Sequence, residues 1–224
     1  MENQPSNVVD IKLQQPLLAG TKIDRKFFFQ HLKDTGLFAS LSQSQVGGMT
    51  TILDHWEQKS GLKDSRYLAY MFGTAYKETG RTMQPIREGF AKTTEGAIKA
   101  VTALYNKGGI KTNYSLPDKT TGKSYFGRGF VQITWLKNYQ AFSKILNIDL
   151  VNNPDLALDP AVATEIMFYG MINGTFTTKK LSDYFTADGK SDWKNARRII
   201  NGLDCADEIA GYAQKFYQSI SVIG

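Results

Sequence analysis

Apolar residues recur at the spacing of an α-helix through most of this chain, and this pattern limits the fold more than any other feature. Side chains suited to capping a helix are found at Asp24, at Ser42 or Ser44, and at Asp64. The segments with helical spacing are 24–38, 46–58, 65–79, 94–106, 132–146, 160–172, 179–185, 192–200 and 207–220. Strand signals are few and short, so the sequence predicts a mainly α fold.

The length and composition suit one globular core. A chain of 224 residues, of which 42% are hydrophobic, can build one ordinary domain. Residues 1–24 are polar, contain proline and lack periodicity, so we expect an N-terminal tail or strap ahead of a single domain over residues 25–224. The segment 107–124 is rich in Gly, Lys and Thr and is expected to be a long surface loop.

Cysteine content and hydropathy bear on the compartment in which the chain is made. Cys205 is the only cysteine, so no disulfide can form within the chain, which suits a reducing compartment. Residues 1–20 lack the basic and apolar regions of a signal peptide. No apolar stretch is long enough to cross a bilayer, so we expect no stable membrane insertion. We also expect a monomer.

The net charge of +6 favours anionic surroundings. The densest basic cluster is residues 194–198, KNARR. We interpret it as the solvated face of a helix, because no nucleic-acid-binding motif accompanies it. No nucleic-acid partner is expected.

Several motifs for cofactors and metals are incomplete. A phosphate loop ending in TTGKS would need glycine where Pro117 stands, and a dinucleotide fingerprint starting at GRG would need glycine at Gln132. His31 and His55 lack a second ligand one helical turn away, and Cys205 has no nearby partner. The sequence therefore predicts no cofactor and no metal.

A predicted helix ends between two carboxylates. Glu78 lies in its last turn, where the helix dipole disfavours an anion, so Glu78 is a candidate proton donor. Glu88 follows a proline-containing turn, and the adjacent cation of Arg87 is expected to help keep it ionised. A carboxyl pair in two such environments is typical of a general acid and a general base acting on a glycosidic bond. Glu95, at the start of the next predicted helix, is the second candidate for the base.

A second stretch, SYFGRGFVQITWLKNY at 124–139, combines aromatic and amide side chains at a junction between a loop and a helix. Aromatic faces with amide and hydroxyl groups suit a polysaccharide groove, because sugars present apolar C–H faces and a rim of hydroxyls. An amphipathic helix with Val131, Ile133 and Trp135 in the core explains the same residues equally well.

YFGRGFVQITWLKNY resembles a signature of family 19 glycoside hydrolases, the group of plant-type chitinases and many phage and bacterial endolysins. AYKETG resembles the end of the helix that carries that family's acid, and NPDLALDPAVATEIMFY, NGTFTTKKLSDYF and RRIINGLD resemble later blocks. The resemblance runs from about residue 64 to residue 217. It implies a lysozyme-like helical fold with a substrate cleft. It also implies cleavage of β-1,4 bonds in a polymer of N-acetylated amino sugars, with inversion.

The resemblance also implies roles for individual residues. Glu78 matches the general acid, Glu88 matches the general base of shorter members, and Thr134 matches the residue that helps to hold the attacking water. Gln132, Asn138 and Asn201 match groove residues that bind the amide and hydroxyl groups of the sugar. Tyr125 and Arg128 are grouped with these substrate-binding residues and are expected to shape the site.

Three positions depart from the family pattern. Lys77 stands where the family usually has His, and Leu136 and Lys137 replace usual Asn and Tyr, which makes a groove for long chitin less expected. The missing disulfides and the basic charge favour an endolysin-like enzyme that cleaves peptidoglycan. Such an enzyme would be made in a bacterial cytoplasm and would act on the cell wall after release. The alternatives are a chitinase acting on chitin oligomers, a catalytically silent amino-sugar-binding protein and, third, a helical nucleic-acid binder.

The enzymatic hypothesis makes one geometric demand. An inverting pair requires the two carboxyl groups to stand roughly 6.5 to 9.5 Å apart across an open cleft. Glu78 held in an internal ion pair, with no opening beside it, would contradict the hypothesis.

Overall fold

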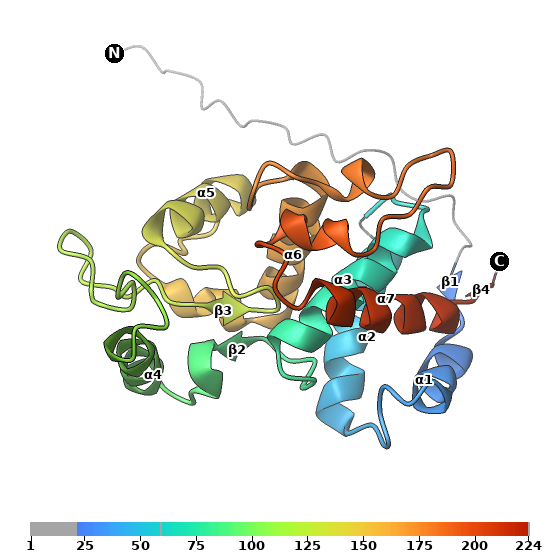
Figure 1. The fold of residues 1–224 in the computed structure, drawn as a ribbon, viewed down its shortest axis with the longest axis horizontal. Helices are drawn as coiled ribbons and strands as arrows, with labels where there is room; N and C mark the ends of the chain where they lie inside the picture. Colours follow the sequence, from blue (N-terminus) through green and yellow to red (C-terminus); the bar gives the residue numbers. More distant parts are fainter. Residues whose placement is uncertain (1–21, 59, 224) are drawn as a thin grey trace, which may run out of the picture.

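The computed structural model describes residues 22–58 and 60–223, and most of them lie in helices (Figure 1). The α-helices are α1 Arg25–Asp34, α2 Gln43–Gln58, α3 Ser65–Glu78, α4 Thr94–Asn106, α5 Leu136–Leu146, α6 Pro160–Asn173 and α7 Ala206–Ser219. Short 3-10 helices are η1 Glu88–Phe90, η2 Pro154–Leu158, η3 Leu181–Asp183 and η4 Asn195–Ile199. The predicted mainly α class is confirmed.

Two small antiparallel ribbons complete the secondary structure of the described residues. Strand β1 Lys22–Ile23 pairs with β4 Val222–Ile223, and β2 Ile86–Arg87 pairs with β3 Arg128–Gly129. Of the tail expected over residues 1–24, positions 1–21 lie outside the described residues, and β1 belongs to the folded part.

Helix α3 is the axis of the main core. Every residue from Leu68 to Tyr76 is buried, so other elements must cover this helix on all sides. Helix α7 lies along it so closely that a Cβ on Gly73 would stand 2.8 Å from the Cβ of Ala213. The rings of Phe72 and Phe216 stack with centroids 5.0 Å apart. The α3–α7 pair therefore forms a rigid support for whatever the ends of α3 carry.

The helix starts predicted from capping residues agree with the structure. The carboxylate of Asp24 accepts a hydrogen bond from Phe27 N at 2.9 Å, and that of Asp64 accepts one from Arg66 N at 3.0 Å. At α2 the cap is Ser42, whose Oγ accepts from Gln45 N at 3.2 Å. The Gln45 side chain returns the bond by accepting from Ser42 N at 2.9 Å, which is a capping box.

Four predicted helices are clearly shorter in the structure. The first, expected over 24–38, ends at Asp34. The segment 132–146 becomes helical only at Leu136, because Gln132 and Trp135 have φ of 53° and 70°. Trp135 N instead donates to Tyr125 O at 2.8 Å, which ties this stretch to the loop before β3. The segments 179–185 and 192–200 contain only the 3-10 helices η3 and η4. Tertiary contacts prevail over helical spacing at these places.

A smaller lobe stands apart from the α3–α7 core. In Figure 1, α4 and the long loop after it lie at one end of the molecule, and α1 and the C-terminus lie at the other. Ala97, Val101 and Phe126 form a separate small apolar cluster in this lobe. The β2–β3 ribbon lies between the lobe and the main core, and one of the candidate carboxylates follows β2 directly.

Candidate active site

A pocket of about 400 Å³ opens where α3 ends, and it contains most of the predicted site residues. The predicted residues that line it are Glu78, Glu88, Gln132, Thr134, Asn138 and Asn201. The other polar and aromatic residues of its wall include Phe90, Tyr114 and Phe176. Residues from six separate stretches of the sequence therefore converge on one opening.

Glu78 is held by a buried arginine. Arg197 Nη1 donates to Glu78 Oε1 at 2.7 Å, and the two side chains are 6% and 19% exposed. Arg197 Nε also donates to Asp204 O at 3.2 Å, so the guanidinium is anchored on both sides. The ion pair does not close the site, because Glu78 still borders the pocket. The arrangement that would contradict the enzymatic hypothesis is therefore not the one observed.

The interpretation of residues 194–198 as a solvated helix face is wrong at Arg197. This stretch forms the 3-10 helix η4, which buries Ala196, Arg197 and Ile199 and leaves Arg198 exposed. Arg197 is the side chain here that meets Glu78, and a basic run of adjacent residues gives no signal for which member is buried.

The turn after α3 explains why a helix ends between two glutamates. Thr79 Oγ1 donates to Ala75 O at 2.7 Å and accepts from Met83 N at 3.1 Å, so the chain turns sharply. Gly80, Arg81 and Met83 take positive φ angles of 56°, 71° and 52°. A continuing helix would carry residue 88 about 15 Å beyond residue 78 along its axis. The turn instead returns Glu88 to the same pocket.

Glu88 is held by the GRG loop and by a tyrosine. Its Oε2 accepts from Gly127 N at 2.8 Å, and its Oε1 accepts from the hydroxyl of Tyr114. Its own backbone N–H donates to Gly127 O at 2.8 Å, which extends the β2–β3 pairing by one residue. Burial and the hydrogen bond to Glu88 raise the pKa of Tyr114, so its hydroxyl remains a donor throughout the neutral range.

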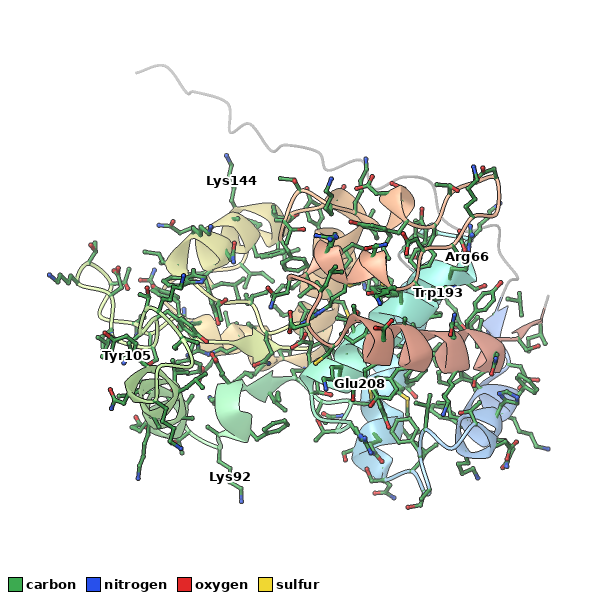
Figure 2. All side chains as sticks on the ribbon, in the orientation of Figure 1. Arg66, Lys92, Tyr105, Lys144, Trp193 and Glu208 are labelled. Atoms are coloured by element: carbon green, nitrogen blue, oxygen red, sulfur yellow. The ribbon has the colours of Figure 1, made fainter. Side chains whose placement is uncertain are left out.

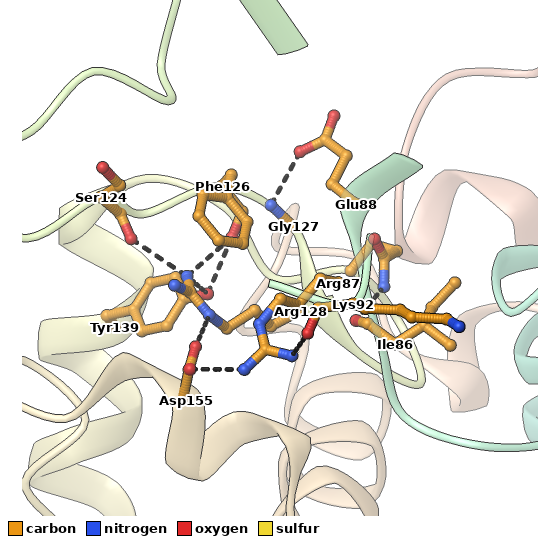
Figure 3. A network of polar contacts seen from close by, with 11 residues as sticks. Ile86, Arg87, Glu88, Lys92, Ser124, Phe126, Gly127, Arg128, Tyr139 and Asp155 are labelled. Carbon is orange, nitrogen blue, oxygen red and sulfur yellow. Dashed lines mark hydrogen bonds and ion pairs between the residues drawn. The ribbon is translucent and has the colours of Figure 1, made fainter. Parts of the chain in front are cut away.

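Arg87, the cation expected to help keep Glu88 ionised, points away from Glu88. Neighbouring residues of a strand point to opposite faces, and Figure 3 shows Arg87 directed toward Asp155 while Glu88 points to Gly127. Arg87 Nη2 lies 2.6 Å from Asp155 Oδ2, and Nη1 donates to Lys92 O at 3.0 Å. The guanidinium of Arg87 therefore pairs with Asp155 behind the pocket wall.

Arg128 lies behind the pocket wall and not in the pocket. It is 1% exposed, and its Nε donates to Asp155 Oδ1 at 2.7 Å (Figure 3). Its Nη1 donates to Ser124 O and to Tyr139 Oη, both at 3.0 Å, and its guanidinium lies 3.7 Å from the ring centroid of Phe126. Burial opposes ionisation of Asp155, but the hydrogen bonds from Arg87 and Arg128 hold the pKa of this carboxyl below its usual value.

Tyr125 is likewise internal. It is 3% exposed, and its hydroxyl lies 2.8 Å from Thr121 Oγ1 and 2.9 Å from Val151 O. Tyr125 and Arg128 therefore do not line the pocket as sugar-binding residues, and their positions fit the expectation that they shape the site. Both residues are buried supports of the loop that carries Gly127.

Two side-chain amides of the pocket wall donate hydrogen bonds to backbone carbonyl groups. Gln132 Nε2 donates to Ile86 O and to Gly129 O, both at 3.0 Å, and so clamps β2 to β3. Asn138 Nδ2 donates to Thr134 O at 2.7 Å, which fixes the segment that presents the Thr134 side chain. The stretch 124–139 is core at Val131 and Ile133, but Trp135 is 42% exposed, so each of the two interpretations describes part of it.

Sequence reasoning missed three residues at this site: Tyr114, Phe90 and Arg197. Tyr114 comes from the segment expected to be a surface loop, and its ring lies 5.1 Å from that of Trp135. Phe90 is 62% exposed, and its ring occupies the space where Gly80 lacks a side chain. A phenylalanine directly after Gly89 in a polar turn was the one available signal.

Other candidate groups lie elsewhere. Glu95, the second candidate base, lines a separate pocket of about 650 Å³ together with Asp155 and not the pocket that holds Glu78. Lys77 pairs with Glu208 on α7, and this hydrogen bond raises the pKa of Lys77. His31 Nδ1 lies 3.1 Å from Ser219 Oγ.

The described ranges contain neither a cluster of metal ligands nor a membrane-spanning helix. Within residues 22–58 and 60–223, no group of three or more His, Cys, Asp or Glu side chains is placed to hold a metal ion. None of the helices in those ranges is both long enough and apolar enough to cross a bilayer.

Two carboxylates from separate elements in one pocket, flanked by aromatic and amide groups, are the arrangement typical of glycoside hydrolases. Comparison with known sequences agrees: the profile of the chitinase class I family of glycoside hydrolases matches residues 64–190. This match spans more than half of the chain, so the protein belongs to glycoside hydrolase family 19.

Curated relatives match over shorter stretches. Endochitinase CH25 of Brassica napus is 33% identical over 89 residues, which is 38% of this chain and 28% of that protein. Endochitinase 1 of Theobroma cacao is 47% identical over 49 residues, which is 21% of this chain and 15% of that protein. The matched part therefore spans less than a third of either relative.

Two solved structures share the fold. Chitinase C from Streptomyces griseus HUT6037 aligns over 86% of this chain and 75% of its own, with a TM-score of 0.51 and 19% identity. The class IV chitinase from Zea mays aligns over 86% of this chain and 90% of its own, with a TM-score of 0.51 and 15% identity. At such identities the likeness concerns the fold alone, and the predicted lysozyme-like helical architecture is confirmed.

Proposed function

We propose that this protein is an inverting chitinase that hydrolyses β-1,4 bonds in a polymer of N-acetylated amino sugars, with chitin as the substrate. The observation that carries the proposal is that Glu78 and Glu88 border one pocket, each held by different partners. Family membership and the names of the relatives support the choice of chitin.

Glu78 is the proposed proton donor. Arg197 holds Oε1, so Oε2 is the oxygen from which the proton passes to the departing glycosidic oxygen. After the transfer Glu78 is an anion, and the guanidinium of Arg197 stabilises that anion. The same contact fixes the carboxyl plane, so the proton donor does not swing away from the pocket.

Glu88 is the proposed base. It takes a proton from a water molecule that attacks the anomeric carbon on the face opposite the leaving group. Tyr114 and Gly127 N hold its two oxygens, and Thr134, on the same pocket wall, helps to hold the water. The bond to the leaving oxygen breaks as the bond to water forms, which inverts the anomeric centre.

Peptidoglycan hydrolysis, as in an endolysin, is the second candidate. The net charge of +6 favours it, because a bacterial envelope is anionic. We rank it second because the family and the relatives described above are named as chitinases.

The test follows the product and the two glutamates. The protein is incubated with β-linked N-acetylglucosamine oligomers and, separately, with purified sacculi, and new reducing ends are followed by NMR. We expect the α-anomer to appear first from the oligomers, and about a 1,000-fold loss of rate for both Glu78→Gln and Glu88→Gln. An initial β-anomer contradicts inversion. Sacculus cleavage with intact oligomers reverses the substrate choice, and tight oligomer binding without new reducing ends identifies a silent sugar-binding protein.

A further inference from the structure

A second hollow, of about 590 Å³, lies at the opposite end of α3 from Glu78. Its wall includes Arg66, Ser191, Trp193, Gln214, Tyr217 and Gln218. None of them borders the pocket that holds the two glutamates. Arg66 and Glu78 lie near the two ends of α3, about 18 Å apart along its axis, so the two openings are separate.

Two aromatic rings form the apolar part of this hollow. The centroids of Trp193 and Tyr217 are 5.7 Å apart, with planes inclined by 52°. Trp193 also packs edge-on against Phe185 at 4.8 Å, which fixes the orientation of the indole, while Tyr217 is 42% exposed. A fixed indole beside an exposed phenol presents the kind of apolar surface on which the C–H face of a sugar ring can stack.

The amide side chains of the wall are uncharged and come from α7. Gln214 and Gln218 are one helical turn apart, and Tyr217 lies on the same face of the helix. Both glutamines are exposed at the surface. Primary amides offer donors and acceptors together, which suits the hydroxyl and acetamido groups of an amino sugar.

Arg66 forms one side of the hollow, and its guanidinium is fully hydrogen-bonded to other protein groups. Its Nε and Nη2 bind Asp64, Nη2 also donates to Thr186 O at 2.9 Å, and Nη1 donates to Lys190 O and Ser191 Oγ, each at 2.9 Å. All the donor groups of the guanidinium are thus used, and the bonds to Thr186, Lys190 and Ser191 hold the loop after η3 against the start of α3. Figure 2 labels Arg66 and Trp193 at this end of the molecule. The hollow is therefore formed before any ligand arrives.

The charge balance selects the class of ligand. Arg66 is the one charged residue among the described residues that line the hollow, and Asp64 neutralises it. An anionic ligand would find no available cation there. A hollow of this size with aromatic and amide walls instead suits an uncharged ligand rich in hydroxyl and amide groups.

We propose that this hollow, the Trp193–Tyr217 site, binds a second stretch of the neutral amino-sugar polymer and holds the enzyme on its insoluble substrate. The identity of the polymer rests on the proposed function. The site itself rests on the aromatic pair, the amides of α7 and the neutralised arginine.

The test compares retention on insoluble chitin with cleavage of short soluble oligomers. Tyr217→Ala removes the exposed ring, and Tyr169→Ala is the matched control, because Tyr169 is a 39% exposed tyrosine on α6 outside the hollow. Retention is measured in a Glu78→Gln background so that hydrolysis does not release the protein. We expect about a fivefold weaker retention for Tyr217→Ala, no change for Tyr169→Ala, and recovery with Tyr217→Trp.

Cleavage of a short soluble oligomer is measured with Glu78 intact. We expect Tyr217→Ala to leave this rate unchanged, since the oligomer does not reach the second hollow. Equal retention of the Tyr217→Ala and Tyr169→Ala proteins would overturn the proposal, as would an equal loss of oligomer cleavage and chitin cleavage in Tyr217→Ala. The parent protein could also show no hydrolytic activity while its retention still depends on Tyr217. That result would support the second site and contradict the proposed function.

Discussion

Glu78 and Glu88 lie on two walls of the pocket that are built differently. Glu78 ends a helix that is buried on all sides, and its partner Arg197 is itself 6% exposed. Glu88 follows a two-residue strand, and its wall is built from backbone pairing, the contact of the buried Arg128 with the half-exposed Asp155, and a small apolar cluster. The difference teaches that the first carboxyl is held by a buried arginine on tightly packed helices, whereas the second is held by hydrogen bonds from a short ribbon and a loop. Changes to the first wall should cost stability and activity together, whereas changes to the second should cost mainly activity.

The junction between α2 and the turn after α3 should show the largest loss of stability. A Cβ on Gly48 would stand 1.8 Å from Met83 O, so Gly48→Ala must displace the turn that separates the glutamates. We expect the free energy of unfolding to fall by about 3 kcal/mol, with loss of activity. Gly47→Ala is the control, since its Cβ would meet nothing within 4 Å, and it should stabilise the protein slightly. Equal stability of the two variants in urea unfolding would show that the turn is not packed as described.

The helix wall itself is tested at its ion pair. Arg197→Met leaves Glu78 without its partner, and we expect a loss of about 2 kcal/mol in the free energy of unfolding together with a lower rate. Arg198→Met removes the same charge from an exposed neighbour and should change neither quantity. If thermal unfolding and oligomer cleavage respond alike to both substitutions, burial of the Glu78 partner does not matter and the contrast between the walls fails.

The hydrogen-bonded wall is tested at Tyr114. Tyr114→Phe removes only the hydroxyl that donates to Glu88, so we expect about a tenfold lower kcat with little change in Tm. Tyr105→Phe, at an exposed tyrosine on α4, serves as the control. A drop in Tm as large as that of Arg197→Met would mean that this wall, too, depends on packing.

The smallest effect is expected at Asp155 and depends on pH. Because hydrogen bonds from Arg87 and Arg128 lower its pKa in the folded state, its contribution to stability is full above its ordinary pKa of 3.8. That contribution is lost as the pH falls through the lower folded value. Asp155→Asn should therefore lower Tm slightly at pH 6, and the difference from the parent protein should shrink as the pH is lowered below about 4. Asp207→Asn, at an exposed ion pair, should show no such dependence. A difference for Asp155→Asn that stays constant with pH would contradict this role.

Local chemistry explains which parts of the fold were predictable. Asp24, Ser42 and Asp64 cap the helices that follow them, and α4 spans 94–106 as its periodicity predicts. Capping and periodicity depend on neighbours within a few residues, so a sequence pattern contains them. Helical spacing gave a wrong prediction at 192–200, because this stretch forms only the 3-10 helix η4, which buries Arg197.

The candidate site divides in the same way. Glu78, Glu88, Thr134, Gln132, Asn138 and Asn201 were expected from the family resemblance and share one pocket, whereas Tyr125 and Arg128 belong to the interior behind it. Conspicuous motif residues can be supports as readily as ligands. Burial separates the two cases, and burial is not visible in a motif.

By itself the sequence determined where several of the helices begin, that the fold is mainly helical, and to which family the chain belongs. Only the tertiary structure decided which groups surround the two carboxyls. Arg197 comes from 119 residues away from Glu78, and Tyr114 and Gly127 come from 26 and 39 residues away from Glu88. Such partners meet because packed helices and paired strands bring distant segments together, and no local preference of the chain records that meeting.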